Sequence, residues 1–178
     1  MAVSTQVALM RAVNVGWRKA VMAELRAWLT ALGFQAPRTL LQSGNLVFGS
    51  GIGGAELEAL LEREALAVLG FATDFIVRSA DEWRALMVAN PFADMARHDP
   101  GHLVVMALRA APSPEAVASL RASIQGREDV RTVGRELYVT YPDGIGDSRL
   151  TTAAIERRLG VRGTARNWNT ATRLATML

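Results

Sequence analysis

The sequence contains no cysteine, a single lysine and only two histidines. Without cysteine the chain has no disulfides, no thiolate nucleophile and none of the usual cysteine-based structural zinc sites. His98 and His102 are separated by Pro100-Gly101, so they cannot share a helix face, and no pattern of carboxylates completes a site around them. We therefore expect no metal site.

Long apolar runs are missing as well. No stretch approaches the roughly 20 apolar residues that a membrane span needs. The N-terminus also lacks the basic start, the uninterrupted apolar stretch and the cleavage site of a signal peptide. Half of the 178 residues are hydrophobic, which is enough to form a sizeable core. We expect a globular protein of the cytoplasm that has no membrane partner.

The near absence of lysine accounts for the high isoelectric point. Lys19 is the exception among twenty basic residues, and the net charge is only +3. Because arginine titrates at very high pH, this small excess raises the isoelectric point to 10.1. The arginines are scattered, and Arg157-Arg158 is their only adjacent pair. A nucleic-acid partner is therefore only weakly supported, since it would favour clustered basic residues.

Residues 1–91 predict a first domain of mixed strands and helices. Apolar, β-branched runs predict strands, and apolar residues at helical spacing predict helices. Ser43-Gly44-Asn45 predicts a hairpin turn, and Ser79-Ala80-Asp81-Glu82 has the spacing of a capping box that opens a helix. The predicted order is strand 6–13, helix 21–32, strands 38–42 and 46–48, helix 57–69, strand 73–78 and a helix from the capping box onward.

The same order repeats in the rest of the chain. Residues 92–101 look like a loop that connects the first domain to a second one, residues 102–178. The second domain is predicted to contain strand 103–108, a helix from Ser113-Pro114, strands 130–133 and 136–141, helix 148–159, strand 162–165 and helix 168–178. Each half reads β-α-β-β-α-β plus a C-terminal helix. The sequence therefore predicts an α+β fold, a duplication of two ferredoxin-like halves with antiparallel sheets.

The run Gly49–Gly54, with the sequence GSGIGG, fits the glycine pattern of dinucleotide-binding proteins. That motif belongs to a parallel sheet, and the sheet expected here is antiparallel. Asp74, at about the right distance for the ribose contact, would begin a strand instead of ending one. We interpret the run as a loop and expect no cofactor.

The predicted topology brings together polar residues that are far apart in the sequence. In the first half, the end of the first strand and the hairpin between the second and third strands lie at one end of the sheet. That end carries Arg11, Asn14, Gln42, Ser43 and Asn45. In the second half, the ends of the third and fourth strands meet. They carry Asp147, Ser148, Arg149, Arg166, Asn167 and Asn169.

Ligand binding and local architecture both explain these polar residues. The second group lies at two helix N-termini, where free N–H groups favour an anion, and Arg166 offers paired donors for phosphate or carboxylate. Alternatively, the asparagines and serines cap helices or close turns, Trp168 anchors the core and Arg166 pairs with an acid. Capping does not explain Arg166.

Several segments resemble a bacterial family catalogued as domain of unknown function 1697. They include VALMRAVNVG, RTLLQSGNLVF, VRSADEWRALM, GRELYVTYPDGIGDSRLT and TARNWNTATRL, in this order along the chain. The resemblance implies a cytosolic α/β protein and carries over no established activity. The chain departs from the family pattern at Ala12 and Trp17, where we expect glycine, and at Arg149, which is usually lysine.

Two functions of different classes follow. We expect a binding module for a phosphorylated small molecule, a nucleotide or a nucleic-acid end, held in a polar cleft between the two domains. The alternative is a homodimeric or protein-interaction module without a small-molecule ligand, in which an exposed Trp17 would contact the partner. Ser43 and Ser148 are candidate nucleophiles, but the sequence identifies no base for either, so no enzymatic activity is assigned.

Overall fold

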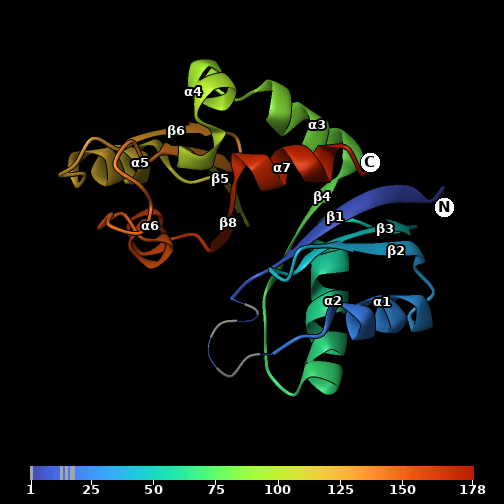
Figure 1. Ribbon diagram of the computed structural model, residues 1–178. Helices are drawn as coiled ribbons and strands as arrows, with labels where there is room; N and C mark the ends of the chain where they lie inside the picture. Colours follow the sequence, from blue (N-terminus) through green and yellow to red (C-terminus); the bar gives the residue numbers. More distant parts are fainter. Residues whose placement is uncertain (1, 13, 15, 17–18) are drawn as a thin grey trace. The chain divides into compact units, whose positions relative to one another are not determined.

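The computed structural model describes residues 2–12, 14, 16 and 19–178, and the chain folds into two compact units (Figure 1). Unit 1 contains the residues up to Ala85 together with Leu174–Leu178, and unit 2 contains Leu86–Arg173. Each unit is built on a four-stranded antiparallel sheet. Within these described residues, no helix combines the length and the apolar character of a membrane span.

Unit 1 has the strand order of a ferredoxin-like sheet. Its strands are β1 (Ser4–Met10), β2 (Gln35–Leu40), β3 (Asn45–Ser50) and β4 (Phe75–Ser79), and its helices are α1 (Met22–Ala31) and α2 (Gly54–Leu69). The sheet order is β2-β3-β1-β4. Figure 1 shows α1 and α2 on the same face of this sheet. Helix α3 (Ala80–Val88) follows β4, and the border between the units lies within it.

Unit 2 repeats this plan, which confirms the predicted duplication. Its strands are β5 (Leu103–Leu108), β6 (Asp129–Val133), β7 (Glu136–Thr140) and β8 (Gly163–Asn167), and α5 (Pro114–Ala122) and α6 (Thr152–Leu159) are its two crossover helices. The sheet order is β6-β7-β5-β8, the counterpart of the order in unit 1. Helix α7 (Trp168–Ala175) follows β8 as α3 follows β4. The fold is therefore α+β, with two ferredoxin-like halves.

Alternating side chains give each sheet one face for its helices. Because residues two apart point the same way in a strand, Ala8 and Met10 both face the helices of unit 1. They pack against Leu25 and Leu29 of α1, which are four residues apart and share one helix face. The core of unit 2 is built in the same way from alternate residues of β5 and β7 and the apolar faces of α5 and α6.

Residues 92–101 differ from the predicted loop, because they contain the short helix α4 (Ala93–His98) and the 3-10 helix η1 (Pro100–His102). Asp94 and Arg97 form an ion pair one turn apart on α4. Pro100 occupies the first position of η1, where its missing N–H removes no helical hydrogen bond. Proline, glycine and aspartate predicted a loop here, but they are equally compatible with the starts of short helices.

Most predicted boundaries shift by a few residues, and two of these shifts affect the candidate site. The helix predicted over 148–159 begins at Thr152, because the Thr151 hydroxyl accepts a hydrogen bond from the backbone N–H of Ala154 and caps the helix. The predicted strand 162–165 extends to Asn167, so Arg166 and Asn167 belong to β8. Both residues therefore occupy a strand, next to the start of α7.

Strand β4 lies at an edge of its sheet. The backbone N–H groups that face away from β1 donate hydrogen bonds to carboxylate oxygens. Glu62 accepts from Phe75 N at 3.0 Å, and Glu58 accepts from Val77 N at 2.9 Å. The predicted capping box supplies the third bond, since Glu82 accepts from Ser79 N at 2.8 Å and donates its own N–H to Ser79 Oγ. These bonds obstruct pairing of β4 with a further strand.

Candidate functional site

Asn14 lies next to the β2–β3 hairpin of unit 1, as the topology predicted. Its hydrogen bonds connect it to Gln42 and to Ala20. The Asn14 side-chain amide donates to the carbonyl oxygens of Gln42 and Ala20, and its oxygen accepts from Ala20 N at 2.9 Å. Asn14 therefore ties the loop that follows β1 to the β2–β3 hairpin. Its φ of 55° is a left-handed conformation that asparagine tolerates.

The hairpin residues of unit 1 also bond to the protein itself. Asn45 is fully buried, and its side-chain nitrogen donates to Leu40 O and to Ser43 Oγ, both at 2.9 Å. Arg11 forms a partly exposed ion pair with Asp74 at 3.4 Å. These interactions are the turn chemistry that the sequence offers as the architectural interpretation. Trp17, the residue expected to contact a partner, lies outside the described residues.

The polar group of unit 2 is divided between two locations. Asn167 caps α7, because its side-chain oxygen accepts from Thr170 N at 2.9 Å, and Asn169 is exposed in the first turn of that helix. Arg166 is buried in β8, where it donates to Thr164 Oγ1 and Ala165 O, both at 2.8 Å. Burial lowers the pKa of Arg166 to about 10, so the side chain stays positively charged at neutral pH.

Arg166 has a counterpart in unit 1 that the sequence reasoning missed. Arg78 of β4 is also buried and pairs with Val7 of β1, as Arg166 of β8 pairs with Val105 of β5. Each guanidinium donates to the carbonyl oxygen of the preceding residue, at 2.9 Å for Arg78 and 2.8 Å for Arg166. A buried arginine at the same strand position in both halves points to shared architecture.

The residue that follows each buried arginine also has the same role in both units, because it caps the next helix. Ser79 accepts from the N–H three residues later and caps α3, and Asn167 accepts from the N–H three residues later and caps α7. Aligning VRS, residues 77–79, with ARN, residues 165–167, is the sequence signal that would have revealed Arg78 as the counterpart of Arg166.

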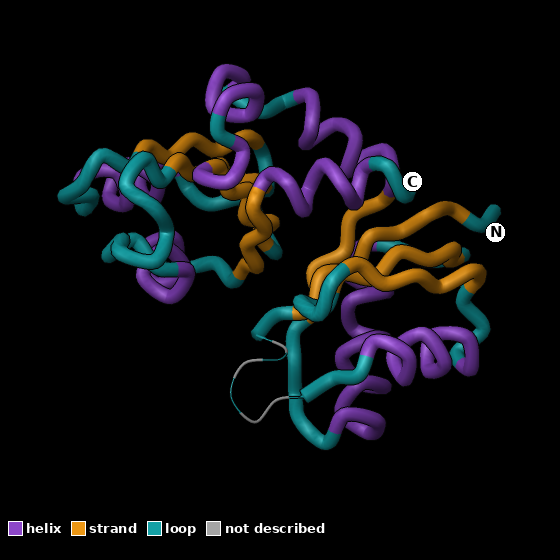
Figure 2. The backbone as a smooth tube through the Cα atoms, viewed as in Figure 1, coloured by secondary structure: helices purple, strands orange, loops and turns teal. Residues whose placement is uncertain are grey.

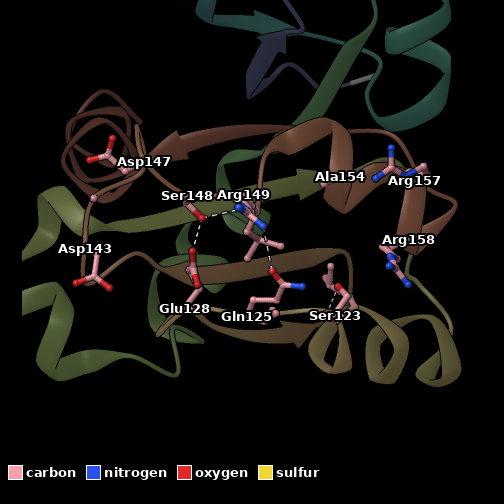
Figure 3. Close-up of a pocket in the computed structure, with 15 residues that line it drawn as sticks. Ser123, Gln125, Glu128, Asp143, Asp147, Ser148, Arg149, Ala154, Arg157 and Arg158 are labelled. Carbon is pink, nitrogen blue, oxygen red and sulfur yellow. Dashed lines mark hydrogen bonds between the residues drawn. The ribbon is translucent and has the colours of Figure 1, made fainter.

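Ser148 and Arg149 line a pocket of about 610 Å³ that lies within unit 2. Its walls come from the C-terminal end of α5, the loop from α5 to β6, the loop from β7 to α6 and the outer face of α6 (Figure 3). The segment between β7 and α6 contains neither helix nor strand (Figure 2). Arg166, Asn167 and Asn169 are not among the lining residues.

Helix α6 supplies the arginines of the pocket because of its amphipathic pattern. Ile155 and Leu159, four residues apart, are buried in the core of unit 2. Ala154, Arg157 and Arg158 have the spacing i, i+3, i+4, so they share the opposite side of the helix and line the pocket. Among the described residues, the side chains of Arg157 and Arg158 form no hydrogen bond or ion pair.

Most other polar groups around the pocket are engaged with one another. Ser148 donates its hydroxyl proton to Glu128 and accepts from Leu150 N at 3.0 Å. Arg149 donates to Gln125 Oε1 at 3.3 Å. These contacts hold the β7–α6 loop against the α5–β6 loop, and Figure 3 shows them in the middle of the pocket.

A second contact joins the same two loops at the pocket edge. Arg127 makes two hydrogen bonds with the carboxylate of Asp143, and these hold the pKa of Asp143 below its ordinary value. Tyr141, at the start of the β7–α6 loop, donates to Leu150 O at 2.9 Å. The loop is therefore fixed at its start, at Asp143 and at Ser148.

The pocket contains two arginine side chains, Arg157 and Arg158, that are available to bind an anion, and it contains a serine hydroxyl next to a carboxylate. Glu128 accepts a hydrogen bond from the Ser148 hydroxyl, which is the geometry that a base would need and that the sequence alone could not identify. That hydroxyl also closes the turn before α6 through Leu150 N, which is an architectural use of it. No group of three or more metal-ligating side chains is found in the described part of the chain.

Comparison with known proteins supports the fold and the family. The structure is similar to that of a conserved bacterial protein from Streptococcus pneumoniae, with a TM-score of 0.78, 22% sequence identity and 99% of each chain covered. At this identity the similarity shows the fold alone. No protein with a curated description matches the chain. The model of a family described as a protein of unknown function, DUF1697, matches residues 3–138. Since this match covers most of the sequence, the chain belongs to the DUF1697 family.

Proposed function

We propose that the pocket of unit 2 binds a phosphorylated small molecule, a class that includes sugar phosphates and nucleotides. The observation that carries the proposal is the pair Arg157 and Arg158, which line the pocket and whose side chains form no ion pair or hydrogen bond within the described residues. Arginine presents several N–H donors in a plane that matches the oxygens of a phosphate. Arg149 lines the same pocket from a different segment.

The duplicated fold shows that this arginine pair is specific to unit 2. Glu62 of α2 accepts from Phe75 N, the first residue of β4, and Glu156 of α6 accepts from Gly163 N, the first residue of β8. These equivalent bonds align Arg63 with Arg157 and Glu64 with Arg158. In unit 1, Arg63 pairs with Glu64 at 2.9 Å. Unit 2 replaces that neutralising glutamate with a second arginine.

The volume of the pocket suits a small molecule. Ligand pockets commonly measure about 300–1,000 Å³, and this one measures about 610 Å³. Arginines in the last turn of a helix also interact favourably with the helix dipole, which is the competing explanation for Arg157 and Arg158. The dipole does not explain why Arg149, which lies outside α6, lines the same pocket.

Thermal unfolding in the presence of inorganic phosphate, glucose 6-phosphate, ribose 5-phosphate, AMP and ATP tests the proposal. A ligand at about 100 times its Kd stabilises the folded state by about 2.7 kcal/mol, which raises Tm by roughly 5–10 °C for a chain of this size. We expect at least one phosphorylated compound to give such a shift. The shift should disappear in the double variant Arg157→Ala/Arg158→Ala.

Two further variants make the result specific. Arg63→Ala/Arg84→Ala removes two exposed arginines from helices outside the pocket, and it should keep the ligand response. Arg158→Glu recreates in unit 2 the Arg-Glu sequence of unit 1, and it should abolish the response. The proposal fails when no phosphorylated compound shifts Tm, or when Arg157→Ala/Arg158→Ala responds like the unchanged protein. The experiment does not test the two functions expected from the sequence, ligand binding in a cleft between the domains and homodimer formation, and both stay predictions.

A further inference from the structure

We infer that the ligand of this pocket is a phosphorylated sugar, whose phosphate binds Arg157 and Arg158 and whose hydroxyl groups bind at Asp147. This inference rests on the proposed binding of a phosphate in the same pocket. It narrows the class of ligand and assigns an orientation to it.

The two ends of the pocket differ in charge. In Figure 3, Arg157 and Arg158 lie at one end, Asp143 and Asp147 lie at the other, and Glu128, Ser148 and Gln125 lie between them. Because Arg127 already neutralises Asp143, the charge that would repel a negative ligand at this end is that of Asp147. A ligand with a phosphate at one end and hydrogen-bond donors at the other matches both ends.

Asp147 is the carboxylate that is available to such donors. Both oxygens of Asp143 accept from Arg127. Glu128 accepts from Ser148, and its second oxygen is buried. Asp147 is exposed and, among the described residues, takes part in no hydrogen bond or ion pair. An ionised carboxylate accepts hydrogen bonds only, so its natural partner is a hydroxyl or an amine.

The remaining lining residues favour a sugar over a nucleotide. Proteins commonly hold nucleobases by stacking them on aromatic side chains. No aromatic residue lines this pocket in the part of the chain that the structure describes. Its neutral polar side chains are instead those of Ser123, Gln125 and Ser148, which are able to hydrogen-bond to hydroxyl groups. The Ser123 hydroxyl already donates to Leu120 O, and Gln125 Oε1 accepts from Arg149, so the Gln125 amide nitrogen is the donor left for a ligand. Leu120 and Ile124 of the α5 end provide an apolar surface for the carbon skeleton.

Isothermal titration calorimetry with four probes tests the inference. Glucose 6-phosphate carries a phosphate and hydroxyls, phosphoethanolamine carries a phosphate and an amine, ethyl phosphate carries the phosphate alone, and AMP adds a base. We expect glucose 6-phosphate to bind at least tenfold more tightly than each of the other three. Asp147→Ala should weaken the binding of glucose 6-phosphate about tenfold and leave the affinity for ethyl phosphate unchanged.

The control and the outcomes separate this inference from the proposed function. Asp81→Ala removes an exposed aspartate outside the pocket and should change no affinity. Unchanged binding of ethyl phosphate to Asp147→Ala also shows that the variant is folded. Equal affinities for glucose 6-phosphate and ethyl phosphate, or tighter binding of AMP or phosphoethanolamine, would overturn the sugar and leave phosphate binding in place. Failure of all four probes to bind would overturn the phosphorylated sugar, and phosphate binding itself fails only if, in addition, no phosphorylated compound shifts Tm.

Discussion

Spectrophotometric titration of tyrosine tests the packing of the loop that frames the pocket. The chain has two tyrosines, Tyr138 and Tyr141, and both are buried. Burial raises the pKa of Tyr141 to about 12, and the negative charge of Glu128 adds to the effect. Burial also raises the pKa of Tyr138, again with a smaller contribution from a glutamate, Glu136. The absorbance of tyrosinate therefore reports only buried groups in the folded protein.

The size of the expected pH effect follows from the difference between the pKa of Tyr141 in the folded state and its pKa in the unfolded state. At pH 10.5 a tyrosine with the ordinary pKa of about 10 is roughly three quarters ionised, whereas one with a pKa of 12 is about 3% ionised. The folded state keeps a proton that the unfolded state loses, so the stability due to Tyr141 is fully present below pH 10 and falls as the pH rises toward 12. The expected loss from Tyr141 is about 1.4 kcal/mol at pH 11.

The assay compares absorbance at 295 nm in native protein and in protein unfolded in urea. Native protein should show almost no tyrosinate at pH 10.5, while the unfolded protein shows a midpoint near pH 10. Tyr141→Phe isolates one residue, because its stability relative to the unchanged protein should improve by about 1.4 kcal/mol between pH 8 and pH 11. A native midpoint near pH 10, with the circular dichroism of the folded state intact, would refute the burial of the loop anchor.

Two further predictions concern the architecture of the repeats. Gly163→Ala places a Cβ 2.6 Å from Met106 Cε, 2.8 Å from Leu108 Cδ2 and 2.9 Å from the carbonyl oxygen of Ala107. We expect it to lower the free energy of unfolding by about 1–3 kcal/mol in urea, whereas Gly101→Ala, which meets no atom within 4 Å, should have little effect. Asn167→Ala and Ser79→Ala each remove a helix cap and should each cost about 1 kcal/mol in the same assay. Lost phosphate binding by Asn167→Ala at unchanged stability would contradict its assignment as a cap.

The fold could be predicted because local patterns and topology agree in this sequence. Strand and helix periodicities gave both copies of the element order, and the capping box at Ser79 and Glu82 has the predicted bonds in both directions. The contact between Asn14 and Gln42 also followed from topology, because both residues lie close to the strand ends that the fold brings together. Predictions of contact succeed where a short connection leaves a residue little freedom.

The pocket could not be predicted, because it depends on how two loops fold against each other. Ser148 lies eight residues beyond the end of β7, so the direction of that strand does not determine its position. The loop instead turns to Glu128, which follows α5, and this contact has no periodic signature in the sequence. Arg157-Arg158 was visible as the only adjacent pair of arginines, but its meaning needed the placement of α6.

Comparing the two halves separates architecture from function more sharply than either half alone. Arg78 and Arg166 are buried at the same strand position and make the same carbonyl bond, so the repeat explains Arg166 without a ligand. Glu64 and Arg158 also occupy equivalent positions, but here the halves differ in charge. What the fold itself requires should be retained in both copies, whereas a site that serves one copy should appear as a difference between them. By this criterion the arginine pair of α6, and not Arg166, is the place to look for a ligand.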